Sequence, residues 1–320
     1  MPASARKHIV DEKTVGTYHC INRCVRRAFL CGDDPLSGKN YDHRKQWVKD
    51  RLEHLSEIFF ADIGNYAIMS NHFHISLRTR PDLAKKCSDD DIVDRWWKLF
   101  PRKIRGSYED HCPQYLREQW LGDKKWLKQK RRRLASISWL MRCLAEYIAR
   151  RANKEDGVTG RFWEGRFKSQ ALLTDAAVLA AGVYIDLNPI RAGIADTLEK
   201  SDFTSIQQRV EDSHSQSKEP YSFLARFKGA SDLIEGEAPF LMVDEKDYIA
   251  ICTWYASRPN DQENPSAAAA HGLRVKDLSE LEQLMRDCPA ALGSAEARKR
   301  KAASAGRKWF RGNAATRRAF

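Results

Sequence analysis

Residues 70–77 read Ser-Asn-His-Phe-His-Ile-Ser-Leu, and over most of this stretch polar side chains alternate with apolar ones. A period of two is typical of a β-strand, in which successive side chains point to opposite faces of the sheet. His72 and His74 are therefore expected on the same face. Two imidazoles at this spacing can bind one metal ion, so the stretch predicts a strand that carries a metal site.

Residues 183–189 read Val-Tyr-Ile-Asp-Leu-Asn-Pro and end a segment with helical character that starts at about Thr174. Tyr184 and Asn188 are four residues apart, so they share one face of a helix. The amide oxygen of Asn188 can complete a metal site beside the phenol. We therefore expect the metal ligands His72, His74 and Asn188 to converge on one point, with the hydroxyl of Tyr184 close by.

This set of side chains fits the cleavage of a phosphodiester bond. A phenol has a pKa of about 10 and is a weak nucleophile at neutral pH, so its target must be activated. A divalent ion, Mg²⁺ or Mn²⁺, can polarise the phosphate and orient it toward the phenol. Tyr184 is then the predicted catalytic nucleophile, His72 and His74 act through the metal, and the expected product is a covalent phosphotyrosine.

Four motifs occur in a fixed order along the chain. They are residues 18–23 (Tyr-His-Cys-Ile-Asn-Arg), 72–74 (His-Phe-His), 160–167 (Gly-Arg-Phe-Trp-Glu-Gly-Arg-Phe) and 184–193, which runs into Asn-Pro-Ile-Arg-Ala-Gly. Together they resemble the REP-associated tyrosine transposases, which belong to the HUH single-strand transposases, U being a hydrophobic residue. The resemblance covers about residues 14 to 210.

The resemblance implies a fold, a site and a substrate. The fold class would be α+β, a ferredoxin-like antiparallel sheet with helices on one face, plus a helical insertion and a helical C-terminal extension. The site would use Tyr184, His72, His74 and Asn188 with Mg²⁺ or Mn²⁺. The partner would be single-stranded or hairpin DNA formed by a palindromic repeat.

The chain departs from the family pattern at two positions. Asp186 stands where a His is expected, and Ser70 stands where a Pro is common. Neither position is a proposed ligand. Two residues along a helix from Tyr184, the Asp186 side chain should point away from it.

Two other functions remain open from the residues alone. A pair of His on a strand is often structural, and a Tyr on an apolar helix face is usually a core residue with a hydrogen-bonded hydroxyl. The protein could thus be a non-catalytic repeat-DNA-binding protein, or a metal-dependent nuclease that uses water and needs Tyr184 only for structure. The ordered set of motifs favours the tyrosine enzyme.

The composition is consistent with a nucleic-acid partner. The chain has 55 Lys and Arg against 43 Asp and Glu, a net charge of +12, and 9 Trp. Positive charge attracts phosphates, and aromatic rings can stack on unpaired bases. The predicted DNA-binding residues are Lys124, Lys125, Lys128, Lys130, Arg131, Arg132, Arg133, Arg23 and Arg166. A second basic run at 298–318 is equally compatible with a solvated tail.

The 320 residues are long enough for a catalytic domain and an appended region. We expect the nuclease domain at 1–214, with a basic helical insertion at about 84–133, and an accessory region at 215–320. That region would hold helices within 239–256 and 272–285, joined by a linker at about 258–270. Without a long apolar segment, the sequence predicts a cytoplasmic, nucleoid-associated protein with no membrane contact, as a monomer or a homodimer. Its eight cysteines are expected to be free thiols, with a metal site at Cys20, Cys24 and Cys31 as the alternative.

The expected elements of the nuclease domain follow from local patterns. They are strands at 17–26, 66–69 and 72–78, helices at 44–60 and 136–153, an extended segment at 162–173 and the Tyr184 helix at 174–188.

Overall fold

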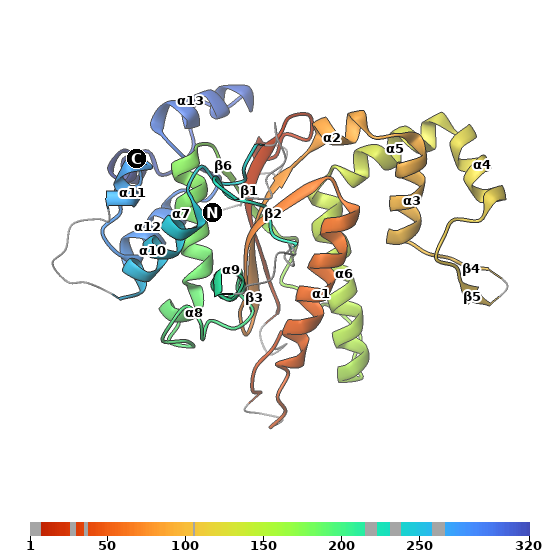
Figure 1. The fold of residues 1–320 in the computed structure, drawn as a ribbon, viewed down its shortest axis with the longest axis horizontal. Coiled ribbons are helices and arrows are strands. Elements are labelled where there is room, and N and C mark those ends of the chain that lie inside the picture. The colour runs from red at the N-terminus through yellow and green to blue at the C-terminus, as the bar shows by residue number, and fades with distance from the viewer. Residues whose placement is uncertain are drawn as a thin grey trace.

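The computed structural model describes residues 8–25, 30–34, 38–104, 106–214, 223–230, 238–257 and 266–320. At its centre lies a five-stranded sheet in the order β2-β3-β1-β6-β7 (Figure 1). The strands are β1 (Gly16–Arg23), β2 (Ala61–Ile68), β3 (His72–Thr79), β6 (Lys168–Leu172) and β7 (Ala291–Leu292). All neighbouring strands pair antiparallel except β6 and β7, which are parallel. The predicted mixed α+β class with a mostly antiparallel sheet is confirmed.

Two helices cover one face of the sheet. They are α1 (His43–Ile58) and α6 (Ile137–Asp156), which pack against each other. Leu52 and Leu55 of α1 bury their side chains in the same hydrophobic core as Phe73 and Ile75 of β3. The apolar residues at helical spacing in 44–60 and those at strand spacing in 72–78 therefore pack in one core, as the sequence predicts.

Other helices cover the opposite face, where α7 (Asp175–Asp186) contacts β2, β3 and β6. It forms a second hydrophobic core with α10 (Glu245–Ala256) and α12 (Leu278–Asp287). The expectation of helices on one face only is therefore wrong. On this face the polar side chains of β3, such as His74 and Ser76, are fully or almost fully buried and hydrogen-bonded under α7, so the polar half of the strand pattern does not mark a solvent-exposed face.

Helix α7 approaches the sheet closely at Gly182. A Cβ at this position would lie 3.0 Å from Oδ1 of Asn65 and 3.1 Å from the hydroxyl of Tyr248. Those two side chains donate to the Asp186 carboxylate, at 2.9 Å from Asn65 and 2.5 Å from Tyr248. Asp186 therefore faces β2 and α10, away from Tyr184, as the helical spacing predicts.

The same carboxylate also accepts from the backbone N–H of Ile206 at 3.1 Å and from the hydroxyl of Ser205. These residues begin α9 (Ser205–His214), so Asp186 caps the N-terminus of that helix. One buried carboxylate thus joins the Tyr184 helix to three other elements.

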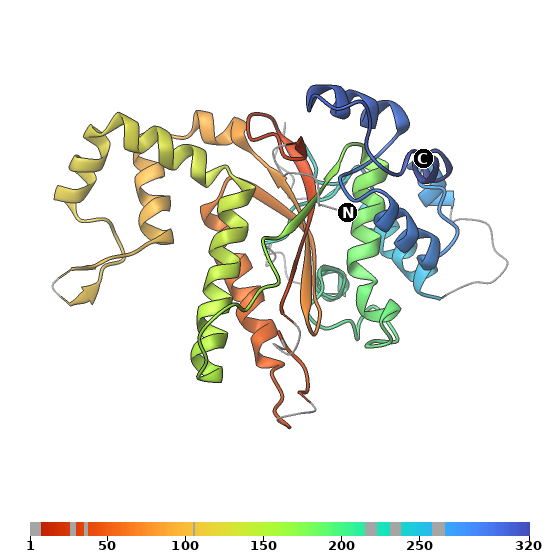
Figure 2. The ribbon, with the colours of Figure 1, turned by 180° about the vertical axis from the view of Figure 1, so that it is seen from behind.

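Residues 81–134 form an arm that extends away from the sheet (Figures 1 and 2). It contains α2 (Pro81–Lys86), α3 (Asp89–Leu99), a hairpin of β4 (Lys103–Ile104) and β5 (Ser107–Tyr108), α4 (Gln114–Gly122) and α5 (Lys124–Leu134). The segment expected as a helical insertion at about 84–133 is therefore mostly helical, with the β4–β5 hairpin in its middle. Trp96, Trp97 and Trp120 are buried within it, so these rings pack the arm together.

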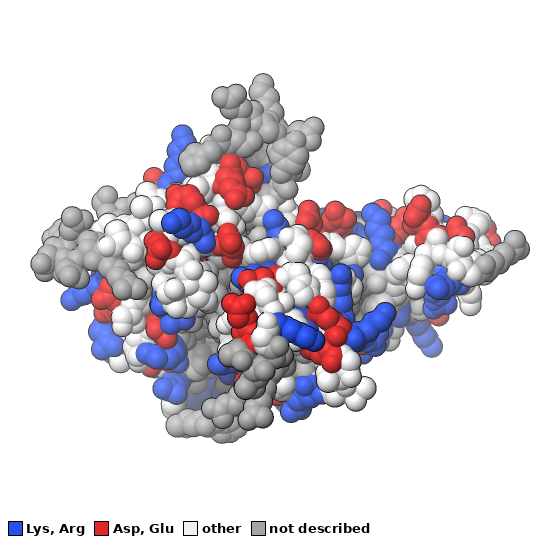
Figure 3. All heavy atoms as spheres, turned by 90° about the horizontal axis from the view of Figure 1, so that it is seen from below, with Lys and Arg blue, Asp and Glu red and all other residues white. Residues whose placement is uncertain are grey.

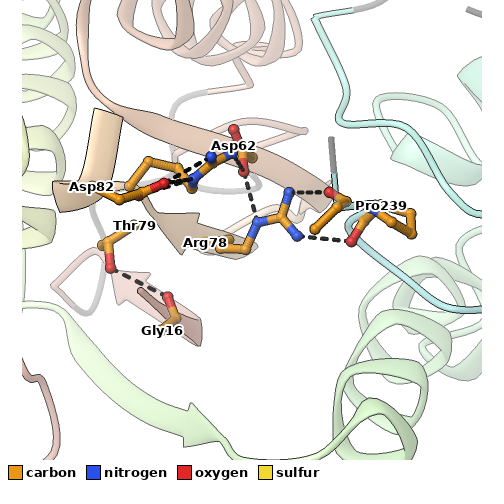
Figure 4. A network of polar contacts seen from close by, with 8 residues as sticks. Gly16, Asp62, Arg78, Thr79, Asp82 and Pro239 are labelled. Carbon is orange, nitrogen blue, oxygen red and sulfur yellow. Dashed lines mark hydrogen bonds and ion pairs between the residues drawn. The ribbon is translucent and has the colours of Figure 1, made fainter. Parts of the chain in front are cut away.

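The C-terminal part of the chain is held against the sheet by several contacts. Arg78, near the end of β3, donates to the backbone oxygens of Pro239 at 2.7 Å and Ala238 at 2.9 Å, and to Asp62 at 2.7 Å (Figure 4). The predicted helices at 239–256 and 272–285 correspond to α10 and α12. Residues 258–265 of the predicted linker lie outside the described residues, and 266–270 form α11 (Ser266–Ala270).

The second basic run is folded rather than a loose tail. It forms α13 (Ala295–Ser304) and α14 (Asn313–Ala319), which follow β7. The buried guanidinium of Arg298 donates to the backbone oxygens of Phe310 at 3.0 Å and Gly312 at 2.9 Å. These bonds fix the segment between the two helices.

All eight cysteines are free thiols, as the sequence predicts. Across the described ranges, none of the helices combines the length and the apolar character that crossing a membrane requires.

Candidate active site

His72 and His74 lie on the same face of β3, with ring centroids 4.8 Å apart. Both side chains line a cavity of about 450 Å³ at the end of the sheet where β3 begins. The strand periodicity therefore positions both imidazoles as the sequence predicts. Whether they bind a metal ion stays a prediction.

Tyr184 reaches this cavity from α7, the helix that packs on the face of the sheet where His72 and His74 lie. Helix α7 starts at the predicted cap, Thr174, whose hydroxyl accepts from the N–H of Ala177 at 3.2 Å. From there the helix carries Tyr184 to the cavity, where its ring lies 5.6 Å from that of His74. Burial raises the pKa of the Tyr184 phenol, while the Arg191 guanidinium and the Asn188 side chain oppose that rise.

Asn188 is close by but is turned inward. It is fully buried at the start of α8 (Asn188–Arg191) and does not line the cavity. Its amide nitrogen donates to the backbone oxygen of Tyr184 at 3.0 Å, and its oxygen accepts from Nη2 of Arg191 at 2.9 Å. The structure therefore brings His72, His74 and Tyr184 together at the cavity, and it places the Asn188 oxygen against Arg191.

His19 of β1 is a third imidazole at the site, and the sequence reasoning gave it no role. Its Nε2 lies 2.8 Å from Nδ1 of His74, and the two rings stack with centroids 5.1 Å apart. His74 pairs with Ile21 in the sheet, so His19, two residues away, is on the same face. Strand parity within residues 18–23 was the signal that could have found it.

The three imidazoles are neutral at pH 7. Burial lowers the pKa of His19 to about 4 and that of His72 to about 4, and it lowers the pKa of His74 well below its usual value. The positive charges of Arg23 and Arg191 add to the effect on His72. A neutral imidazole keeps the lone pair that a metal ligand needs.

The remaining nitrogens suit a metal ion. Nδ1 of His72 lies 2.6 Å from the side-chain oxygen of Asn71, which leaves its Nε2 for another partner. Nε2 of His74 is buried and has no hydrogen-bond partner among the described residues, which is costly unless a ligand meets it. Two imidazole nitrogens therefore fit a metal, although the described part of the chain holds no group of three or more His, Cys, Asp or Glu placed to bind one.

Four cationic side chains also line the cavity: Arg23, Arg166, Lys168 and Arg191. Glu164 lies at the same wall, 3.7 Å from Arg23, and Glu282 of α12 lies 3.1 Å from Arg191. The excess of positive charge suits a phosphate-bearing ligand. Arg23 and Arg166 were predicted from the sequence, whereas Lys168 and Arg191 were not.

The basic run of α5 lies elsewhere. The insertion leaves β3 at its far end, after Thr79, whereas His72 begins the strand. At about 3.3 Å per residue, the two ends of β3 are roughly 23 Å apart. On the side shown in Figure 3, acidic side chains are interspersed with basic ones over the insertion. The run therefore does not form a wall of the cavity.

Two members of the run are engaged within the arm. Lys130 is buried, with its ammonium 4.3 Å from the ring centroid of Trp96 and 5.2 Å from that of Trp126. Arg131 donates to the backbone oxygen of Cys87 and to Asp89, both at 2.6 Å. Their charged groups therefore contact other residues of the arm, and whether these two residues also bind DNA stays a prediction.

The other five residues of the run remain accessible to different degrees. Arg133 is half-buried, with its guanidinium 4.1 Å from the ring centroid of Trp139. Lys124, Lys125, Lys128 and Arg132 are exposed, and Lys124 pairs with Asp89 at 3.2 Å. Whether these exposed cations bind DNA stays a prediction.

Comparisons with known proteins give one distant likeness. No protein-family model matches the chain, and no curated protein matches it. Among solved structures, the chain is similar to a REP-associated tyrosine transposase bound to a REP hairpin. The identity is 13% and the TM-score is 0.35, over 62% of this chain and 81% of that one.

Proposed function

We propose that this protein is a metal-dependent single-stranded DNA endonuclease and strand transferase. It would cleave and rejoin DNA at palindromic repeat hairpins through a covalent phosphotyrosine. The observation that carries the proposal is the meeting of Tyr184 with His72 and His74 in one cavity whose wall bears four cationic side chains.

His72 and His74 would hold Mg²⁺ or Mn²⁺, and Asn188 is the proposed third ligand. Bound there, the ion would polarise the scissile phosphate as a Lewis acid. The oxygen of Asn188 already accepts from Arg191, but an amide oxygen has two lone pairs and can serve a second partner.

The protein's own side chains would carry the rest of the reaction. Arg23, Arg166, Lys168 and Arg191 would bind the phosphates that flank the cleavage site and hold the strand in place. The phenolic oxygen of Tyr184 forms a bond to phosphorus as the bond from phosphorus to the leaving sugar oxygen breaks. The phenol gives up its proton to solvent, and the leaving oxygen takes up a proton to become a hydroxyl.

Rejoining runs the same step in reverse. A DNA hydroxyl attacks the phosphotyrosine, the bond between phosphorus and the phenolic oxygen breaks, and Tyr184 regains its proton. The phosphodiester energy is kept in the covalent intermediate, so no nucleotide cofactor is needed.

The test is a denaturing gel of end-labelled hairpin DNA incubated with the protein and Mn²⁺. Wild type should give a band of DNA linked to protein, and Tyr184→Phe should give none while it still binds the hairpin. Tyr147→Phe is the matched control, because Tyr147 lies on α6 and does not line the cavity.

Three results would contradict the proposal. A linked band that persists in Tyr184→Phe would exclude this residue as the nucleophile. Cleavage by wild type without any linked band would favour the nuclease that uses water. Hairpin binding with neither cleavage nor a linked band would favour the repeat-binding protein.

A further inference from the structure

A chain of hydrogen bonds runs across three neighbouring strands to His74. Gln170 of β6 pairs with His19 of β1 in the sheet, and its side-chain oxygen lies 3.3 Å from Nδ1 of His19. Nε2 of His19 in turn lies 2.8 Å from Nδ1 of His74. All three side chains are at least 95% buried, with exposed fractions of 5%, 2% and 3%.

The orientation of the Gln170 amide is set by the C-terminal region. Its nitrogen donates to the backbone oxygen of Met285 at 3.3 Å and to that of Cys288. A carbonyl oxygen only accepts hydrogen bonds, so the amide nitrogen must face the two carbonyls. The amide oxygen of Gln170 is then the atom that faces His19.

This orientation determines where each imidazole carries its proton. An amide oxygen accepts, so Nδ1 of His19 must be the protonated nitrogen and Nε2 must carry the lone pair. Nε2 of His19 then accepts from Nδ1–H of His74. The lone pair of His74 is left on Nε2, which is the buried nitrogen without a partner among the described residues.

The reverse arrangement is unfavourable at the Gln170 end, because it would turn the amide oxygen toward two carbonyl oxygens. At the other end Nε2 of His74 has no partner among the described residues in either arrangement, but only its lone pair can bind a metal ion. Each buried polar group left unpaired costs about 1–3 kcal/mol.

We propose that Gln170 and His19 are positioning residues that hold His74 in the tautomer whose Nε2 can bind a metal ion. Residues 285–288 would set that tautomer through their backbone carbonyls. The identity of the metal rests on the proposed function. The assignment of the protonated ring nitrogens of His19 and His74 does not.

Cys288 is itself in contact with a buried cation through its sulfur. Arg298 of α13 donates to Sγ of Cys288 at 2.9 Å and to the backbone oxygen of Gly312 at 2.9 Å. The C-terminal helices therefore hold the acceptors of Gln170 in place. Such outer partners of metal-binding His typically change metal affinity by about 10- to 100-fold when they are removed.

The first experiment needs no variant, metal or DNA. Long-range ¹H–¹⁵N correlation spectra of the metal-free protein, labelled with ¹⁵N-histidine, report which ring nitrogen carries the proton. We expect His19 and His74 both to be protonated on Nδ1. A proton on Nε2 of His74 would overturn the inference.

The second experiment measures Mn²⁺ affinity by electron paramagnetic resonance. Gln170→Leu should mix the tautomers of His74 and weaken Mn²⁺ binding about 10-fold or more. Ser76→Ala is the matched control. Ser76 lies on the same strand and face as His74, and the substitution removes its buried hydrogen bond to Asn65, which is outside the chain of three residues. It should change neither the tautomer nor the affinity.

A conservative pair separates positioning from packing. His19→Gln keeps an amide oxygen that can accept from Nδ1–H of His74, whereas His19→Phe keeps the ring stack and loses the acceptor. His19→Gln should retain more Mn²⁺ affinity than His19→Phe. Equal affinities in both, or wild-type affinity in a folded Gln170→Leu, would overturn the inference.

These readouts separate the inference from the proposed function. A wild type that shows the expected tautomer and its loss in Gln170→Leu, but never cleaves DNA, would refute the enzyme and retain the positioning role. If Gln170→Leu fails to fold, the wild-type tautomer and the His19 pair still decide the question.

Discussion

Arg191 donates a hydrogen bond from Nη2 to the side-chain oxygen of Asn188 at 2.9 Å. The same guanidinium lines the cavity and lies 5.8 Å from the ring centroid of Tyr184. One cation therefore contacts the proposed third metal ligand and faces the space where a phosphate would lie. Because Arg191 would share the Asn188 oxygen with the proposed metal ion, this cation should weaken metal binding while it strengthens phosphate binding.

We expect Arg191→Met to bind Mn²⁺ about fivefold more tightly in the absence of DNA, because the Asn188 oxygen loses a competing hydrogen bond worth about 1 kcal/mol. The variant should bind hairpin DNA more weakly. Isothermal titration of each ligand measures both effects. Arg142→Met, on the exposed side of α6, serves as the control, and unchanged Mn²⁺ affinity in Arg191→Met would argue against Asn188 as a ligand.

His72→Ala should abolish cleavage at low Mn²⁺ by removing one ligand. Excess Mn²⁺ should restore part of the activity, because His74 and Asn188 remain available. Cleavage rates across a Mn²⁺ titration give the measurement. A rate that stays at zero while the metal-bound form accumulates would show that His72 acts in some way other than through the metal.

Replacing Lys124, Lys125, Lys128 and Arg132 with Ala should reduce the salt dependence of single-stranded DNA binding. Each lost phosphate contact lowers the slope of log affinity against log salt by about 0.7. Lys130→Ala should instead lower the melting temperature, because it removes a cation that packs against the rings of Trp96 and Trp126. A slope that stays unchanged in the fourfold variant would assign these residues to a solvated face.

Asp186→Asn should destabilise the protein by about 1–3 kcal/mol, because an amide nitrogen would meet donors that now surround a carboxylate. Urea unfolding measures the loss. Asp202→Asn is the control, since Asp202 is exposed and accepts from Gln207 outside this network. A loss equal to that of the control would mean that the buried bonds to Asp186 add little stability.

The free energy of unfolding of the metal-free protein should fall as the pH drops from about 6.5 to about 4. His19 and His72 have pKa values of about 4 in the folded protein and about 6.5 in an unfolded chain. The unfolded state therefore binds more protons in this window, which favours unfolding. Above about pH 7 these groups no longer contribute to the pH dependence of the free energy of unfolding.

Urea unfolding at a series of pH values tests this dependence. His19→Gln removes one titrating group, so its slope between pH 6.5 and 4 should be flatter than that of wild type. Equal slopes in the two proteins would contradict the depressed pKa of His19.

Local sequence patterns were sufficient for the elements that carry His72, His74 and Tyr184. A period of two positions both imidazoles on one face of β3, and the cap at Thr174 fixes the start of α7. These features depend only on residues that are close in the sequence, a few positions apart on one strand or within one or two turns of one helix. That is why they could be read without knowing which strands pair.

The features that sequence reasoning missed depend on contacts between distant segments. The pairing of His19 with Gln170 requires the register between β1 and β6, and the fit of Gly182 against Asn65 requires α7 to lie on β2. The burial of Lys130 follows from the way α3 and α5 pack. No local period encodes such neighbours, so the sequence showed this Lys only as one member of the basic cluster at 124–133.

The parallel pairing of β7 with β6 has a consequence for how the chain is made. During synthesis β6 emerges long before residues 291–292, so its outer edge stays unpaired until they appear. Until then Gln170 also lacks the carbonyls of Met285 and Cys288. A nascent chain halted at residue 214 would expose the apolar side of α7 to water, so such fragments should be substrates for chaperones and proteases rather than stable proteins.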